Sequence, residues 1–230
     1  MTLPPLRLVI FDVDGTLVDS QADILAAMGH AFSLAGHPLP PRATVLSIVG
    51  LSLDVAVARL APELDAALHA RMVDWYKEAY IALRAQTGAA QSSPLYPGAL
   101  AAIEALHARP EILLGVATGK SLRGLDKLFE AHDLGRYFVT RQVSDHHPSK
   151  PHPSMIAAAL SETGIAPGNA VMIGDTSYDM DMAQAAGIAA IGVGWGYHPR
   201  ETLARTAALD VIDDFSQLTP CLDLLWENAS

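Results

Sequence analysis

The chain has 230 residues, half of them hydrophobic, and a formal net charge of -10 at pH 7. This length can bury a sizeable core in one large domain, or in one domain that carries a smaller insertion. The negative charge argues against nucleic acid and anionic membrane surfaces as partners. An anionic substrate would therefore need a local cationic site or a metal ion.

Cysteine content and hydropathy narrow the class of protein further. Cys221 is the only cysteine, which excludes an internal disulfide framework and a cysteine-rich metal site. No apolar run reaches the ~20 residues that span a bilayer, and the first residues lack the pattern of a secretory signal peptide. We therefore expect a soluble, cytoplasmic protein, and the sequence does not indicate its oligomeric state.

Short apolar runs rich in branched residues predict five buried strands, at residues 6–11, 112–117, 137–140, 170–173 and 189–193. Helices are predicted between them, at residues 99–108, 121–132, 154–163 and 179–186. Strands that alternate with helices indicate an α/β fold, in which helices cover both sides of a parallel sheet.

Residues 20–96 interrupt this alternation. They contain no convincing strand, and leucine, alanine and methionine recur at helical spacing in residues 20–35, 53–60 and 63–84. Residues 85–97 are expected to form a looser segment, because glycine, serine and proline gather there. We interpret residues 19–96 as an all-helical cap domain, inserted into an α/β core of residues 1–18 and 97–230.

Two aspartates directly follow the first predicted strand, in Asp12-Val-Asp14-Gly-Thr. Ligands of open parallel sheets bind at the carboxyl ends of the strands, so both carboxylates are expected to face one crevice. Their repulsion is costly unless a cation or a shared proton relieves it. Gly15 allows a tight turn with exposed backbone amides. A polar turn after a strand is the alternative interpretation.

The second strand ends in Thr118-Gly119-Lys120. A hydroxyl followed by a free glycine amide suits a phosphate oxygen, although Thr118 taken alone is better explained as a helix N-cap. After the third strand, Lys150 lies on a stiff segment between two prolines. Its ammonium is placed to neutralise a carboxylate and a phosphate, although a lysine in a loop is usually only solvated.

Three histidines near this lysine raise the question of a zinc site. They are His146, His147 and His152, and their spacing matches no common zinc motif. No cysteine is available to complete such a site, so we do not expect zinc here.

The fourth strand is followed by Gly174-Asp175-Thr-Ser-Tyr-Asp179. Magnesium prefers a few carboxylate oxygens together with substrate phosphate and water, and this pair of aspartates suits it. Asp179 equally suits the positive end of the following helix. Four strand ends thus supply carboxylates, a hydroxyl and a lysine at one edge of the sheet, a combination that no structural need explains.

Taken in order, these segments resemble the four motifs of the haloacid dehalogenase superfamily. Asp12-Val-Asp-Gly-Thr, Thr118, Lys150-Pro and Gly174-Asp-x-x-x-Asp179 carry the resemblance, which covers nearly the whole chain. The helical insertion resembles that of members with a small helical cap. The segments Val49-Gly-Leu and Tyr96-Pro-Gly look most like the corresponding segments of phosphoglycolate phosphatases and their relatives. The resemblance implies a Rossmann-like parallel sheet flanked by helices, and a magnesium-dependent phosphatase acting on a small phosphorylated metabolite.

The resemblance also implies catalytic and metal-binding roles. Asp12 would attack phosphorus and form an aspartyl phosphate, while Asp14 would protonate the leaving alkoxide and later accept a proton from water. Mg²⁺ would be held by Asp12, the backbone carbonyl of Asp14, and Asp175. Asp179 would orient this set of ligands.

Substrate contacts follow from the same resemblance. Thr118 and the amide of Gly119 would hold phosphoryl oxygens, and Lys150 would offset the anionic charge at the reacting phosphate. In the cap, the loop around Gly50 is expected to contact the substrate. Any of five cationic cap residues could meet a substrate carboxylate: Arg42, Arg59, Arg71, Lys77 and Arg84. We expect the cap to move as a lid, hinged near residues 17–18 and 95–97.

Several other activities are considered. The dehalogenases of this superfamily typically lack a carboxylate at the position of Asp14. A phosphonate-cleaving relative would need a lysine early in the cap, where this chain has only the late Lys77. Phosphoglucomutase-like transfer and pyrophosphatase activity remain open, although mutases usually have Glu-Asp where this chain has Gly174-Asp175. A catalytically inactive binding protein is a further alternative, against which the retention of every catalytic residue type argues.

Overall fold

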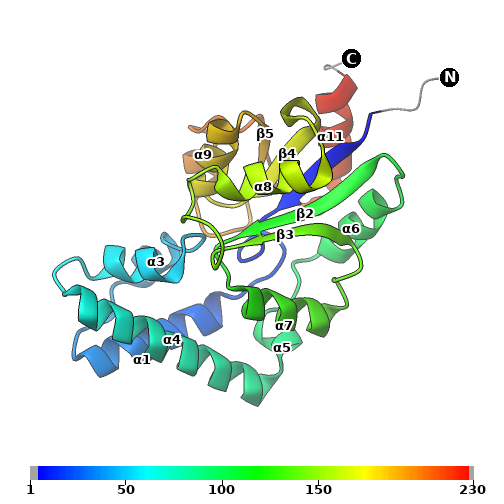
Figure 1. Cartoon of the computed structure of the whole chain (residues 1–230). Helices are drawn as coiled ribbons and strands as arrows, with labels where there is room; N and C mark the ends of the chain where they lie inside the picture. The colour runs from blue at the N-terminus through cyan, green and yellow to red at the C-terminus, as the bar shows by residue number, and fades with distance from the viewer. Residues whose placement is uncertain (1–4, 228–230) are drawn as a thin grey trace.

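The computed structural model describes residues 5–227. The expected core ranges, 1–18 and 97–230, extend beyond these residues at both ends. Six parallel strands form one sheet in the order β3-β2-β1-β4-β5-β6 (Figure 1). In chain order they are β1 (Arg7–Phe11), β2 (Ile112–Thr118), β3 (Phe138–Val143), β4 (Ala170–Gly174), β5 (Ala189–Val193) and β6 (Asp210–Ile212).

The central position of β1 sets the geometry of the site. Four of its residues, Leu8 to Phe11, are fully buried, as expected for a strand covered on both faces. Phe11 pairs in register with Val116 of β2 and with Ile173 of β4. The carboxyl ends of these three strands therefore lie level with one another, at the point where the strand order reverses.

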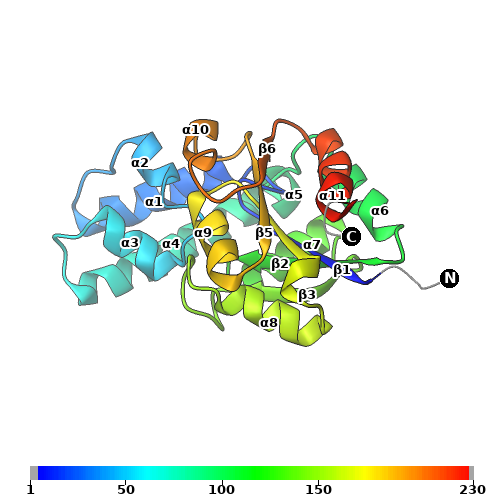
Figure 2. The same cartoon turned by 90° about the horizontal axis from the view of Figure 1, so that it is seen from above.

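Helices cover both faces of the sheet, as predicted (Figure 2). One face packs against α6 (Ala99–His107), α7 (Leu122–His132) and α11 (Leu218–Glu227). The other packs against α8 (Ser154–Thr163), α9 (Ser177–Ala186) and α10 (Arg200–Leu203). Short 3₁₀ turns at Pro167–Asn169 and Phe215–Gln217 complete the core. No helix among residues 5–227 is long and apolar enough to cross a membrane.

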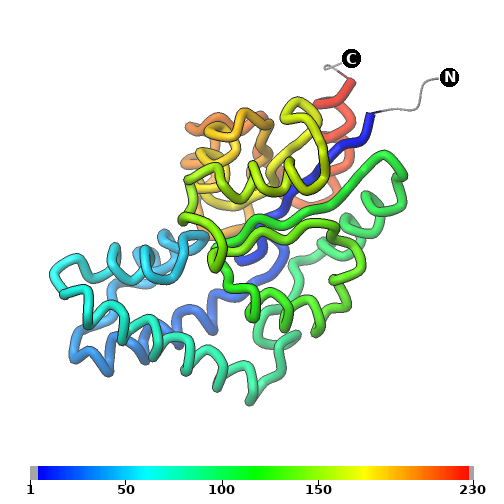
Figure 3. The backbone as a smooth tube through the Cα atoms, viewed as in Figure 1, coloured from blue at the N-terminus to red at the C-terminus, as the bar shows by residue number. Residues whose placement is uncertain are grey.

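The segment between β1 and α6 contains helices and their connecting loops, and it lies to one side of the sheet (Figure 3). Its helices are α1 (Gln21–Ala35), α2 (Arg42–Leu46), α3 (Leu53–Leu60), α4 (Ala66–Thr87) and α5 (Ala89–Ser92). These helices bury apolar side chains of their own, including Met28, Phe32 and Met72, separately from the clusters on the sheet. We keep the name cap for residues 19–96, and this boundary stays a prediction.

The two connectors between cap and core run side by side. Val18 and Leu95 form an antiparallel bridge. The Asp19 amide donates to the Pro94 carbonyl at 2.9 Å, and the Tyr96 amide donates to the Leu17 carbonyl at 2.9 Å.

The structure corrects several expected element bounds. β3 continues through Arg141-Gln-Val143 because side chains of this edge strand alternate between buried and exposed, so its apolar run is shorter than the strand. The expected loose segment at 85–97 contains the end of α4 and all of α5. α9 begins at Ser177 rather than at 179, because Thr176 caps it. The sequence did not predict β6 or α11.

Candidate active site

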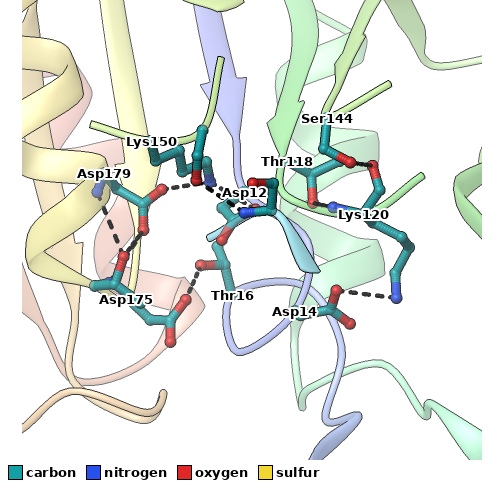
Figure 4. Close-up of polar contacts among 12 residues, drawn as sticks. Asp12, Asp14, Thr16, Thr118, Lys120, Ser144, Lys150, Asp175 and Asp179 are labelled. Atoms are coloured by element: carbon teal, nitrogen blue, oxygen red, sulfur yellow. Dashed lines mark hydrogen bonds and ion pairs between the residues drawn. The ribbon is translucent and has the colours of Figure 1, made fainter. Parts of the chain in front are cut away.

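The four segments singled out in the sequence meet at the carboxyl edge of the sheet (Figure 4). Asp12 follows β1, Thr118 ends β2, Lys150 follows β3, and Asp175 follows β4. All four side chains are almost completely buried. The level register of the central strands brings them together, as expected from the topology.

Asp12 is a buried carboxylate whose negative charge is only partly offset by its neighbours. It is 1 % exposed, and neither of its oxygens takes part in a hydrogen bond among the described residues. Lys150 Nζ lies 2.9 Å from Oδ1 as an ion pair, without hydrogen-bond geometry. Burial raises the pKa of Asp12 to about 7, although the positive charge of Lys150 opposes this rise. The carboxylate is therefore poised for a cation or an electrophile.

Lys150 is not the solvated loop lysine that its sequence context allows. Its side chain is fully buried, and Nζ lies 2.6 Å from Asp179 Oδ1 as well as 2.9 Å from Asp12 Oδ1. Burial disfavours the ammonium, but the two carboxylates outweigh this effect and raise its pKa. One cation thus links the carboxylate after β1 to the first turn of α9.

Asp179 has both features expected from the sequence: it lies in the acidic cluster, and it stands at the start of a helix. Its Oδ2 accepts from the Thr176 amide at 3.1 Å and from the Thr176 hydroxyl at 2.7 Å, within a capping box at the start of α9. Its other oxygen contacts Lys150. The carboxylate is held on both sides, which suits a residue that positions its neighbours.

Asp175 is fixed by two donors. The Thr16 hydroxyl donates to Oδ1 at 2.9 Å, and the Tyr197 amide donates to Oδ2 at 2.8 Å. Burial raises the pKa of Asp175 well above its usual range, and the charges of Asp12 and Asp179 raise it further. Gly15 and Gly196 press against this side chain, and a Cβ at either position would lie within 2.2 Å of it. These glycines make room for the carboxylate.

The acidic residues fit a divalent metal ion. Ligand oxygens of Asp12, Asp175 and Asp179 lie within 4.8 Å of one another, and all three residues are buried. Three carboxylates share this cluster with the ammonium of Lys150, so the cluster carries more negative charge than Lys150 offsets. Hard cations such as Mg²⁺ prefer such oxygen donors.

Asp14 points away from this cluster. Its Oδ2 lies 2.9 Å from Lys120 Nζ, and its Oδ1 accepts from the Ser20 hydroxyl at 2.5 Å. Burial disfavours the charge of Lys120, but the adjacent Asp14 outweighs this and raises the lysine's pKa. The sequence motifs assign Lys120 no role, although its position at the end of the second strand is the available signal.

Thr118 and Gly119 lie where the core meets the cap. The Thr118 hydroxyl accepts from the Lys120 amide at 3.2 Å. A Cβ on Gly119 would lie 2.5 Å from the Gly50 carbonyl oxygen, so core and cap backbones touch here. Gly50 itself has a φ of +100°, which favours glycine.

Further contacts join cap and core beside α9. The Ser47 carbonyl accepts from the Tyr178 hydroxyl at 3.1 Å and lies 3.0 Å from His198 Nε2. The Arg59 guanidinium lies over the Tyr178 ring at 5.5 Å. The loop at 194–198 therefore also contacts the cap.

Of the three histidines considered for zinc, His147 lies between Gln142 Oε1 and Ser154 Oγ, at 2.8 Å from each. His152 Nδ1 accepts from the Ser154 amide at 3.2 Å. These contacts give both rings a structural role around the start of α8.

A cavity of about 770 Å³ opens between cap and core. Asp12, Asp14, Thr118 and Gly119 line one end, and Gly50 lines the cap side. The cavity places a bound molecule against the predicted catalytic residues. Of the five cationic cap residues considered above, Lys77 and Arg84 line it.

Comparisons with known proteins agree with this arrangement. A family model described as haloacid dehalogenase-like hydrolase matches residues 9–193. The probable phosphatase IndB of Dickeya dadantii is 33% identical over 226 residues, covering 97% of this chain and 96% of that protein. A phosphoglycolate phosphatase of Pseudomonas savastanoi pv. phaseolicola is 31% identical over 223 residues, covering 95% and 80%.

A solved structure supports the fold. A haloacid dehalogenase-like family hydrolase from Streptococcus pneumoniae superposes with a TM-score of 0.80 at 25% identity, covering 94% of this chain and 97% of that one. The family match spans most of the chain and includes all four strand ends of the site. This chain therefore belongs to the haloacid dehalogenase-like hydrolases, and it resembles the phosphatases among them.

Proposed function

We propose that this chain hydrolyses the phosphomonoester of a small metabolite through an aspartyl phosphate on Asp12. The observation that carries the proposal is the buried Asp12 carboxylate, which forms an ion pair with Lys150 and lines the cavity between cap and core. A nucleophile needs a free lone pair directed at its substrate, and the burial of this group keeps competing water away.

In the proposed reaction an Asp12 oxygen forms a bond to phosphorus while the bond from phosphorus to the leaving oxygen breaks. Asp14 gives its proton to that oxygen, and the alcohol leaves. Asp14 then accepts a proton from water, whose oxygen bonds to phosphorus while the bond from phosphorus to Asp12 breaks, and inorganic phosphate is released. The separation of Asp14 from the cluster around Asp12 supports this division of roles, because Lys120 and Ser20 hold the acid apart from that cluster.

Phosphoryl binding is assigned to the remaining core residues. Lys150 would reduce the repulsion between Asp12 and the phosphoryl oxygens, a role that its buried ion pair supports. Thr118 and the Gly119 amide would donate to those oxygens, and both residues line the cavity.

Mg²⁺ fits this site, with Asp12, Asp175 and the backbone carbonyl of Asp14 as proposed ligands. Asp179 would act through its contact with Lys150 and through the cap of α9, as a positioning residue. When bound, the ion would neutralise charge on the phosphoryl group.

Phosphoglycolate is the first substrate to test, because relatives of this chain are named phosphoglycolate phosphatase. Phosphoglucomutase-like transfer and pyrophosphatase activity use the same nucleophile and remain as alternatives, as does a binding protein without activity. The cytoplasmic location expected from the sequence also stays a prediction.

The decisive experiment measures phosphate release from 4-nitrophenyl phosphate, phosphoglycolate and pyrophosphate, with magnesium and with excess chelator. We expect hydrolysis of a monoester that chelator abolishes and magnesium restores. Mass spectrometry of quenched enzyme should find phosphate on Asp12, and Asp12→Asn should lose several orders of magnitude in rate. Phosphate trapped on another residue, or full activity in chelator, would reject the mechanism.

The cap is proposed to act as a lid that rotates about the paired connectors at residues 17–18 and 95–97. Their mutual hydrogen bonds support a common hinge, because two adjacent strands can bend together. Exchange of residues 19–96 with those of a relative should transfer substrate preference. Preference that stays with the core would locate specificity in core loops such as 194–198 instead.

A further inference from the structure

The cavity is large compared with a two-carbon leaving group. Its volume of about 770 Å³ lies within the ~300–1,000 Å³ typical of pockets for drug-sized ligands. Beyond the catalytic residues the walls are largely apolar, with Ile24, Met28, Val49 and Ile81 among them. Glycolate offers almost no apolar surface to such walls, so it would leave most of the cavity filled with water.

One face of α4 supplies the aromatic and cationic part of the lining. Tyr76, Tyr80 and Arg84 lie four residues apart, so they form one stripe along the helix, and all three line the cavity. The two tyrosine rings stack with centroids 5.8 Å apart and planes at 24°. Arg84 lies 5.8 Å from the Tyr80 centroid, and Lys120 Nζ lies 5.3 Å from it. The stripe ends at α7, where Arg84 Nη1 contacts the Gly124 carbonyl.

Two polar atoms of this stripe are buried without partners. They are the Tyr80 hydroxyl oxygen and Arg84 Nη2. Arg84 Nη1 donates only a long 3.4 Å bond to the Gly124 carbonyl. Asp23 attracts this guanidinium electrostatically, but no salt bridge forms between them. Buried donors without acceptors are costly, so this pair is prepared for an acceptor that a ligand brings.

The charge distribution points to an anionic acceptor. Five of the chain's 15 lysines and arginines line this cavity, although the protein as a whole is acidic: Lys77, Arg84, Lys120, Arg123 and Lys127. Apart from Asp12 and Asp14, the carboxylates lining it among residues 5–227 are Asp54 and Asp145. Lys120 is already paired with Asp14, and Lys127 with Glu130. The remaining three cations outnumber Asp54 and Asp145, which favours negative charge on the part of the ligand beyond the phosphoryl group.

We propose that the substrate's leaving group is larger than glycolate, has an apolar or aromatic body, and ends in a carboxylate or similar anionic acceptor. This inference rests on the phosphatase function proposed above. The body packs against the Tyr76 and Tyr80 rings and the apolar walls. The acceptor binds Arg84 and the Tyr80 hydroxyl, so Arg84 determines specificity within the cap.

The test uses phosphonates, in which carbon replaces the bridging oxygen so that binding is measured without hydrolysis. Calorimetry with magnesium compares benzylphosphonate, its 3- and 4-carboxy derivatives, and 3-phosphonopropionate, the matching analogue of phosphoglycolate. We expect the better carboxybenzyl isomer to bind the wild-type protein about 10–100-fold more tightly than benzylphosphonate, the range typical of a charge-assisted hydrogen bond. We also expect it to bind more tightly than 3-phosphonopropionate.

Variants then assign the effect to one residue. Arg84→Met should abolish the preference for the carboxylated ligand, and Arg84→Lys should retain part of it because the charge remains. Tyr80→Phe, which removes a single atom, should lower the preference several-fold. Arg71→Met is the matched control, because Arg71 is exposed on the same helix, lies over Trp75 and does not line the cavity. It should leave the preference unchanged.

Tighter binding of 3-phosphonopropionate than of every benzylphosphonate would overturn the size assignment. No preference for the carboxylated ligand, or the same preference in Arg84→Met as in the wild type, would overturn the role of Arg84. Hydrolysis of 4-nitrophenyl phosphate by the wild-type protein separates this inference from the proposed function. Absence of hydrolysis together with the expected binding pattern would refute the phosphatase while supporting the ligand class.

Discussion

Replacement of Asp12 by asparagine should make the metal-free protein more stable while removing its proposed nucleophile. Burial moves the pKa of Asp12 from 3.8 to about 7 in the folded protein. The folded state therefore binds more protons than the unfolded state between these values, and its stability falls as pH rises through them. At about 1.36 kcal/mol per unit, the charge costs the fold about 4 kcal/mol above pH 7.

Asparagine keeps the shape and removes this charge. Its amide is also buried without an assured partner, which costs about 1–3 kcal/mol. The expected net gain at pH 8 is thus about 1–3 kcal/mol. Urea denaturation in excess chelator measures it, and with an m value of about 2–3 kcal/mol/M the midpoint should rise by about 0.3–1.5 M. At pH 5 the wild-type carboxylate is largely protonated in the fold, so the gain should shrink.

Magnesium should reverse this order of stability between the wild type and Asp12→Asn. An ion that binds only the folded state stabilises it by an amount that grows with its concentration, and removal of one ligand weakens that effect. We expect magnesium to raise the wild-type midpoint more than that of Asp12→Asn. Asp126→Asn is the matched control, because its 53% exposed side chain forms only a surface ion pair with Arg141. A variant less stable than the wild type in chelator at pH 8, or a gain equal at pH 5 and pH 8, would refute the reasoning.

Three further substitutions test the site. Lys150→Met leaves Asp12 and Asp179 buried without their shared cation, so urea denaturation in chelator should show a loss of about 3–5 kcal/mol, and an unchanged midpoint would contradict the buried ion pair. Thr176→Val removes the hydroxyl that caps α9 and contacts Asp179; we expect a loss of about 0.5–2 kcal/mol by thermal denaturation, and no loss would show that the capping box is dispensable. Gly119→Ala places a Cβ 2.5 Å from the Gly50 carbonyl oxygen and should displace the cap. We therefore expect kcat/KM to fall by about 10²-fold. Gly168→Ala is the control and should leave kcat/KM unchanged, because a Cβ at Gly168 meets open space.

The sequence identified the strands and the site because both depend on local signals. The buried strands are apolar runs, and the catalytic segments directly follow them, so parallel topology alone brings Asp12, Thr118, Lys150 and Asp175 together. β6 escaped prediction because it has only three residues, the first of which is an exposed aspartate. In α11, Leu218, Leu222 and Trp226 recur every four residues and are buried. This spacing is typical of a helix, so the sequence does contain a signal for α11.

Partnerships between distant side chains required the structure. The sequence suggested that Lys150 neutralises a carboxylate, but its complete burial between Asp12 and Asp179 depends on how the segment after β3 folds back over the sheet. The pairing of Lys120 with Asp14 likewise joins two strand ends whose side-chain directions no periodicity specifies. The choice of Lys77 and Arg84 among five cationic cap residues rests on helix packing in the same way.

The pairing of the two connectors has a consequence for how the core tolerates an insertion. A flexible segment of such length would impose a loop-closure entropy on the strands at its ends. Here the chain leaves and re-enters the core through adjacent hydrogen-bonded residues, Leu17 with Tyr96 and Asp19 with Pro94. Once folded, the inserted helices therefore constrain the core strands no more than a short hairpin at the same point would. The core can accept a longer, shorter or differently folded insertion at this point without a change in the spacing of its strands.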